Sequence, residues 1–158
     1  MKILLALDSS VHSERALEFI TRVRWPAGSR VIVVSVLQPL IGAGAGPFEA
    51  AVIPEGLIEE QQRQARVDVA AAEARLRDAG FPTESRIETG DPRDTLVQVA
   101  RDERADILVV GSHGRTGLAK LMLGSVSSHV VTHAPCSVLV VKTHGSRTVA
   151  RAAERSST

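Results

Sequence analysis

The chain of 158 residues has few of the residue types on which several protein classes depend. It has one cysteine, Cys136, which excludes a disulfide within the chain and a zinc site with two or more cysteine ligands. Its aromatic residues are one tryptophan and three phenylalanines, without the interleaved basic residues of a base-stacking surface. These shortages argue against a disulfide scaffold, a cysteine-rich zinc module and an aromatic RNA-binding platform.

The chain also has no marked excess of positive or negative charge. Nineteen Lys and Arg residues oppose eighteen Asp and Glu residues, which gives a net charge of +1. A protein that binds the phosphate backbone of nucleic acids usually has a marked basic excess, so no nucleic-acid partner is expected. The region from Lys142 onward is locally basic, and residues 143–158 are expected to form a disordered tail.

Long apolar runs are absent as well. No stretch approaches the roughly 18 residues of a membrane-spanning helix. The apolar part of the first ten residues, MKILLALDSS, is shorter than the core of a secretory signal peptide. We therefore expect a cytoplasmic protein without a membrane partner.

Short apolar runs are present and predict a parallel sheet. Residues 3–7, 31–37, 107–110 and 138–141 are rich in Val, Ile and Leu, as strands covered on both faces usually are. Residues 83–89 alternate more and predict a fifth strand near an edge. This length and pattern fit a single domain.

Helical patterns separate the predicted strands. The first follows Ser9 and Ser10, either of which could cap it, and should stop at Pro26 and Gly28. The second spans residues 54–79 and should carry its charges on a solvated face, and the third opens at Asp91-Pro92. The fourth covers residues 125–133. Strict alternation of strand and helix predicts an α/β fold with right-handed crossovers and helices on both faces of the sheet.

Glycines cluster after the fourth predicted strand. Gly111, Gly114 and Gly117 lie within seven residues, and Gly124-Ser125 opens the fourth helix. Glycine permits positive φ and close approach of a ligand, and successive backbone N–H groups bind anions. A helix N-terminus also favours phosphate. Gly117 alone could simply let the loop turn, but the set as a whole predicts a phosphate site.

Two familiar phosphate motifs do not fit these glycines. A Walker loop needs Gly-Lys-Ser/Thr at the helix start, whereas Leu123 precedes Gly124 here. The dinucleotide fingerprint follows the first strand of its fold, not the fourth. Hydride transfer therefore has no support.

Individual side chains near the loop leave alternatives open. Asp8 could contact a ligand, cap a helix, or do both. His113 is expected to present its backbone N–H, and Arg115 could either pair with phosphate or remain solvated. His129 and His133 lie one turn apart, but no third metal ligand is evident. We expect neither a catalytic residue nor a protein-bound metal.

The spacing of the glycines resembles a known family. Gly111-x-x-Gly114, nine residues and Gly124-Ser125 resemble the G-2x-G-9x-G-S/T motif of ATP-binding universal stress proteins. Gly90-Asp91-Pro92 and the stretches 105–115 and 133–141 are similar too. The resemblance covers residues 1–142 as one domain and leaves 143–158 as the tail. It matches poorly at residues 40–53, which we expect to form a flexible flap.

The resemblance implies a fold and a ligand. The fold would be a flavodoxin-like, adenine nucleotide α-hydrolase-like sheet with strand order 3-2-1-4-5. The ligand would be ATP or a related adenine nucleotide, with Mg²⁺ or Mn²⁺ as a companion of its phosphates. Asp8 would face the ribose or the phosphate–metal region, and Val36 would offer backbone groups to adenine. The residues that would wrap ribose and phosphates are Gly111, Ser112, His113, Gly114, Arg115, Thr116 and Gly117, and those that would hold the phosphates are Gly124, Ser125 and Val126.

The implied function is a nucleotide-dependent regulatory module of the stress response, with at most slow hydrolysis. The alternatives are a slow ATPase or nucleotidyl-transfer enzyme at the same site, or a dimer that binds cyclic AMP or AMP or acts like a chaperone. The last strand is apolar and expected at a sheet edge, where it invites pairing with another chain. Similar proteins dimerise through this strand, which implies a homodimer with Val138, Leu139 and Val140 at the contact.

Overall fold

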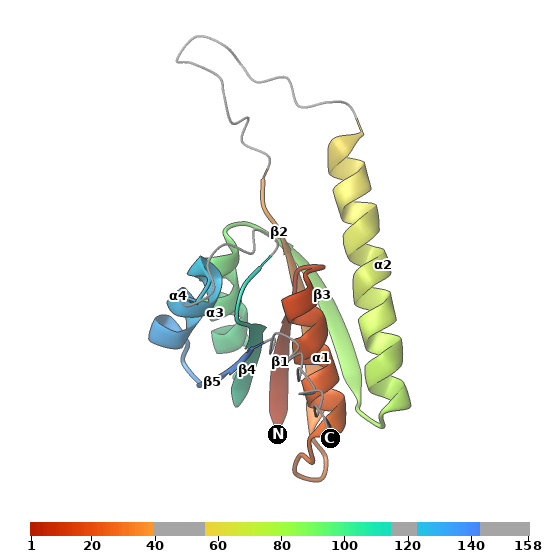
Figure 1. The fold of residues 1–158 in the computed structure, drawn as a ribbon, viewed down its shortest axis with the longest axis vertical. Coiled ribbons are helices and arrows are strands. Elements are labelled where there is room, and N and C mark those ends of the chain that lie inside the picture. The colour runs from red at the N-terminus through yellow and green to blue at the C-terminus, as the bar shows by residue number, and fades with distance from the viewer. Residues whose placement is uncertain (40–55, 115–122, 143–158) are drawn as a thin grey trace, which may run out of the picture.

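The computed structural model describes residues 1–39, 56–114 and 123–142, which form one five-stranded sheet flanked by helices (Figure 1). All strand pairs are parallel and the order is β3-β2-β1-β4-β5, as the resemblance implied. The strands are β1 Lys2–Leu7, β2 Arg30–Leu37, β3 Thr83–Thr89, β4 Ile107–Gly111 and β5 Ser137–Val141. The helices are α1 Val11–Arg22, α2 Leu57–Asp78, α3 Pro92–Asp102 and α4 Ser125–His133.

The predicted elements are confirmed, with changes at two helix ends. Helix α1 ends at Arg22, before the expected stop at Pro26, because Val23 turns extended while its N–H still bonds to Phe19 O at 3.1 Å. Helix α2 begins at Leu57. The expected flap at residues 40–53 and the tail at 143–158 lie outside the described residues.

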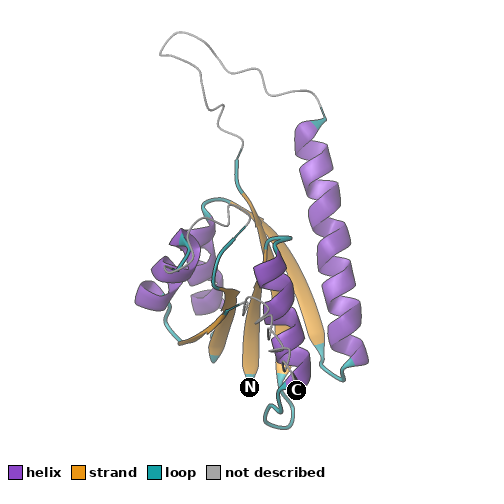
Figure 2. Cartoon of the chain, in the orientation of Figure 1, coloured by secondary structure: helices purple, strands orange, loops and turns teal. Residues whose placement is uncertain are grey.

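Helices cover both faces of the sheet (Figure 2), and alternate residues of the strands supply the two faces of the core. On β1, Ile3 and Leu5 pack with α1 and α2, whereas Leu4 packs with α3 and α4. All three side chains are fully buried. This alternation follows from the two-residue repeat of a strand and requires apolar residues on both faces, as the short runs predicted.

The carboxyl ends of the strands meet at one edge of the sheet. The chain order reverses between β1 and β4, which are neighbours in space but far apart in sequence. Helix α2 starts beyond this edge and runs down along β2 and β3 (Figure 1). The edge is therefore bordered by loops from the middle of the sheet and by the first turns of α2. This is the position where open α/β sheets bind ligands.

The N-terminus of α3 carries a charged cap that we expect to affect stability with pH. Asp91 is the N-cap and accepts from Arg93 N at 2.8 Å. Hydrogen bonds from the Arg93 side chain, and then from its backbone, lower the pKa of Asp91 to about 2. A lowered pKa stabilises the fold above the ordinary value near 3.8, and this contribution is lost as pH falls towards 2.

We therefore predict that Asp91→Asn lowers the free energy of unfolding at pH 7 by less than about 1 kcal/mol, because the pair is exposed. The difference in free energy of unfolding between the variant and the unsubstituted protein should narrow as the pH falls from 5 to 3. Urea unfolding of both proteins at several pH values measures it. A difference that stays constant or widens on acidification would contradict this account.

Candidate functional site

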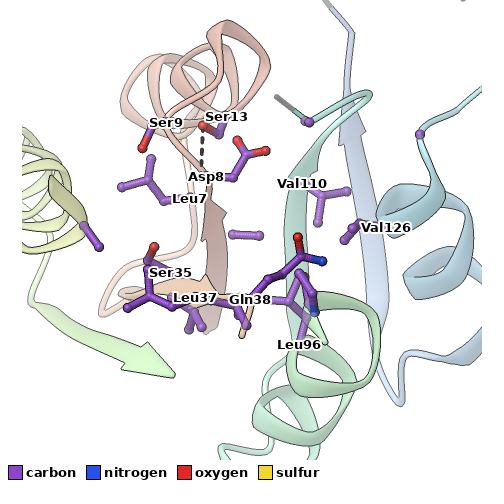
Figure 3. Close-up of a pocket in the computed structure, with 18 of the residues that line it drawn as sticks. Leu7, Asp8, Ser9, Ser13, Ser35, Leu37, Gln38, Leu96, Val110 and Val126 are labelled. Carbon is purple, nitrogen blue, oxygen red and sulfur yellow. Dashed lines mark hydrogen bonds between the residues drawn. The ribbon is translucent and has the colours of Figure 1, made fainter. Parts of the chain in front are cut away.

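A cavity of about 710 Å³ opens at the carboxyl edge of the sheet. The ends of β1, β2 and β4 form its floor, and parts of α2, α3 and α4 form its walls (Figure 3). Eight of the predicted site residues line this cavity, namely Asp8, Val36, Gly111, His113, Gly114, Gly124, Ser125 and Val126. This volume lies within the usual range for small-molecule sites.

The two glycine-bearing stretches meet in space. Gly124 N donates to Ser112 O at 2.8 Å. A Cβ added to Gly124 would lie 3.2 Å from His113 Cα, so the loop and the start of α4 are in close contact. The expectation that the glycine loop and the start of α4 meet is therefore met by the geometry, and the convergence of their other backbone N–H groups on a phosphate stays a prediction.

The structure adds a reason for glycine that the sequence did not indicate. Gly111 and Gly114 are not among the positive-φ glycines, so of the two reasons given for them, positive φ does not apply and close approach of a ligand stays a prediction. Close packing within the protein is the added reason. A Cβ on Gly111 would lie 2.7 Å from the backbone carbon of His12, and a Cβ on Gly114 would lie 2.8 Å from Asp8 Oδ2. Gly111 thus makes room for α1, and Gly114 makes room for a carboxylate.

Asp8 is a cavity residue and Ser10 is the helix cap. Ser10 Oγ accepts from Ser13 N at 3.1 Å and so caps α1. The Asp8 carboxylate accepts from Ser10 N at 3.1 Å, and Asp8 N donates to Ser13 Oγ at 3.4 Å (Figure 3). The bond from Ser10 N places the Asp8 carboxylate at the start of α1, beside Gly114.

Ser112 lies beneath the loop rather than on the cavity wall. It is 3% exposed, and its Oγ lies 3.1 Å from His113 Nδ1 and 3.4 Å from His12 Nδ1. Its backbone N–H donates to Val141 O at 2.9 Å in β5. Ser112 therefore joins the loop to α1 and β5.

The start of α4 is arranged for an anion. Its N-cap, Gly124, provides no side-chain hydrogen bond, so the first N–H groups of the helix are left to other partners. Ser127 Oγ donates to Gly111 O at 2.7 Å and ties the helix to the end of β4. These contacts hold the N–H groups in place before any ligand binds.

Arg115, Thr116 and Gly117 lie outside the described residues. Their expected contacts with ribose and phosphates stay predictions, and both interpretations of Arg115 stay open.

Sequence reasoning missed the wall that α2 contributes. Glu60, Gln61 and Gln64 line the cavity, although the charged face of this helix was expected to be solvated. Arg63 bonds to the Glu60 carboxylate at 2.6 Å and lowers its pKa below the usual range. No local signal marks these residues, because helical periodicity does not reveal which distant edge a helix overhangs. The α2 side of the cavity carries the Glu60–Arg63 ion pair and the amides of Gln61 and Gln64, whereas the β4 side faces the N-terminus of α4.

Within residues 1–39, 56–114 and 123–142, no helix is both long and apolar enough to cross a membrane.

Comparison with known proteins agrees with the fold. The universal stress protein family matches residues 1–142. A universal stress protein of Thermus aquaticus is 35% identical over 141 residues, which cover 89% of this chain and 97% of that protein. The solved structure of MJ0577 from Methanocaldococcus jannaschii is 31% identical, with a TM-score of 0.77 over 92% of this chain and 97% of that one.

A further solved structure was determined with a nucleotide. The universal stress protein of Archaeoglobus fulgidus in complex with dAMP is 26% identical, with a TM-score of 0.61 over 90% of this chain and 98% of that one. The match over nine-tenths of the chain, together with the shared sheet, shows that this chain belongs to the universal stress protein family.

Proposed function

We propose that the protein binds an adenine nucleotide in the cavity at the carboxyl edge of the sheet and acts as a nucleotide-dependent regulatory module. The observation that carries this proposal is the contact between Gly124 N and Ser112 O, which unites the glycine loop and the start of α4 in one wall. Backbone N–H groups and a helix dipole directed at one place favour a phosphate group.

The uncapped N-terminus of α4 sets the direction of the ligand. Phosphates would lie at the β4 side, over Gly114, Gly124, Ser125 and Val126. The base would lie near Val36 in β2, two strands away, which is about 10 Å. Asp8, in β1's loop between them, would meet the ribose.

The relative from Archaeoglobus fulgidus supports an adenine nucleotide as the ligand, since that protein was solved with dAMP. The more specific proposal is that the ligand is ATP. It requires room for two further phosphates beyond the monophosphate, which the open side of the cavity would supply.

Binding, with at most slow hydrolysis, fits the side chains better than rapid turnover. Phosphoryl transfer needs a positioned metal, cationic groups and an oriented nucleophile. The Asp8 carboxylate is already held by Ser10 N, and His113 Nδ1 shares Ser112 Oγ. One oxygen of Asp8 and one nitrogen of His113 therefore have structural partners, whereas His113 Nε2 is buried without a hydrogen-bond partner in the described part of the chain.

A divalent cation would arrive with the phosphates. Among the described residues, no group of three His, Cys, Asp or Glu side chains is suited to a metal ion. Mg²⁺ or Mn²⁺ would take most of its ligands from phosphate oxygens and water, as hard cations do. Asp8 is the carboxylate nearest the glycine loop and could add one oxygen.

Two measurements test the proposed function. The purified protein is denatured and the released small molecules are identified by mass spectrometry, and calorimetric titration of ligand-free protein is performed with ATP, AMP, dAMP and cyclic AMP. We expect an adenine nucleotide in the first and saturable binding in the second. A folded protein that binds none of the four would refute the proposal.

We also propose that two copies pair through β5. This strand is at the sheet edge, and Val138 and Val140 are only partly buried. Val141 O accepts from Ser112 N and so faces the β4 side. Because hydrogen-bonding groups alternate along a strand, those of Val138 and Val140 face the free edge and are available to a second chain.

Val140→Pro is therefore expected to convert the dimer to a monomer, because proline removes an outward N–H without touching the ladder to β4. Val140→Thr keeps the N–H and the branched shape, and should remain dimeric. Light scattering after size-exclusion chromatography measures the mass of each variant. A dimeric Val140→Pro protein with unchanged circular dichroism would argue against this interface.

A further inference from the structure

Helix α2 faces the proposed base end of the cavity. It packs on β2 and β3, the strands farthest from the glycine loop on that side of the sheet. Gln61 and Gln64 bring two amide groups to the cavity wall, and Ser35 and Leu37 of β2 line the same cavity. A ligand whose phosphates bind at β4 would therefore present its base towards these amides.

One of the two amides is held in a fixed orientation. Gln64 Nε2 donates to Asp68 Oδ1 at 2.8 Å, one helical turn along. The other carboxylate oxygen of Asp68 accepts from Ser9 Oγ in the loop after β1. Only the nitrogen of an amide can donate to a carboxylate, so the pairing settles which end of the Gln64 amide lies at Asp68.

The backbone of Ser9 supports this chain of contacts. Ser9 has φ of 61°, a left-handed conformation that is costly for any residue other than glycine. It lines the cavity beside Asp8, and its side chain carries the bond that reaches α2. The strained residue thus links the floor of the cavity to the helix that forms its wall.

We propose that Gln64, oriented by Asp68 and Ser9, makes the site selective for a purine with a 6-amino group over one with a 6-oxo group. With its nitrogen held at Asp68, the amide keeps its oxygen as the acceptor for a donor on the base. The amino group of adenine is such a donor, whereas the 6-oxo group of hypoxanthine is an acceptor and would face another acceptor. This inference rests on the proposed function and adds the residues that select the base.

The test compares AMP with IMP, which differ at this position of the purine. Calorimetric titration of the unsubstituted protein should show AMP binding about 10-fold more tightly, as expected for one hydrogen bond gained against an unfavourable contact. In Gln64→Met the ratio should fall to about 3-fold or less, mainly through weaker AMP binding. Gln64 is exposed, so this variant is expected to fold normally.

Asp68→Ala tests whether the orientation of the Gln64 amide matters, and not only its presence. This variant keeps Gln64 but lets its amide turn over, so the ratio should again fall to about 3-fold or less. Ser9→Gly removes the hydroxyl at a position whose φ suits glycine, and should weaken the selectivity without harming the fold. Gln98→Met is the matched control, because Gln98 makes the same 2.8 Å bond to Asp102 on α3, outside this cavity.

The outcomes distinguish this inference from the function on which it rests. Equal affinities for AMP and IMP in the unsubstituted protein, or an unchanged ratio in Gln64→Met and Asp68→Ala, would overturn the inference while nucleotide binding stood. A change of ratio in Gln98→Met as large as in Gln64→Met would overturn it too. A folded protein that binds neither nucleotide would refute both the inference and the proposed function.

Discussion

Gly114→Val is expected to abolish nucleotide binding and to leave the fold intact. A Cβ at this position would lie 2.8 Å from Asp8 Oδ2, and the two methyl groups of valine would need further space around this point of the cavity wall. Both the carboxylate and the backbone N–H groups of the loop would lose their positions towards a ligand. We expect the dissociation constant for AMP to rise on the order of 100-fold or more, equivalent to about 2.7 kcal/mol.

Calorimetric titration measures the affinity, and circular dichroism with thermal unfolding reports the fold. Gly114→Ala provides a graded control, since its single methyl group meets only the far end of the flexible Asp8 side chain. Its loss of affinity should be smaller than that of Gly114→Val. Retention of full AMP affinity by a folded Gly114→Val protein would show that phosphates do not lie over this loop.

Gly111→Ala is expected instead to cause a large loss of stability. The added Cβ would lie 2.7 Å from both the backbone carbon and the Cβ of His12, and 2.9 Å from its backbone oxygen. These atoms belong to α1, whose buried face is fixed against the sheet by Leu17 and Ile20. Because the helix backbone cannot move without disturbing that packing, we expect a loss of about 2–3 kcal/mol in the free energy of unfolding.

Urea unfolding measures this loss, and Gly114→Ala again supplies the comparison. Its close contact is with a side-chain oxygen rather than a backbone, so its cost should stay below about 1 kcal/mol. If the two alanine variants are equally stable, the assignment of Gly111 to helix packing is wrong. The pair tests whether two glycines three residues apart serve different purposes.

These two glycines also show how much of the structure a local sequence pattern can predict. The spacing of Gly111, Gly114 and Gly124 predicted correctly that two distant stretches meet at one end of the sheet. It did not indicate why each position is glycine. Positive φ, one of the two reasons considered, is absent from Gly111 and Gly114, and the close contacts of both are with residues from the start of the chain.

Asp8 shows the same limit of a local sequence pattern. From the sequence it could be a helix cap or a ligand contact, since both uses suit an aspartate at the end of a strand. The structure assigns the cap to Ser10 and places the Asp8 carboxylate against Gly114. The choice depended on the position of β4, about 100 residues away in the chain, and no pattern near Asp8 contains that information.

The sequence by itself determined the order of the elements, both edge strands and the start of α4, because each depends on local periodicity and capping residues. The tertiary structure alone decided that Ser112 lies beneath the loop and that α2 forms a wall of the cavity. The physical reason is that a helix or strand repeat specifies which face is apolar. Which distant surface that face meets, and how far a helix extends past the sheet, follows only from packing the whole chain.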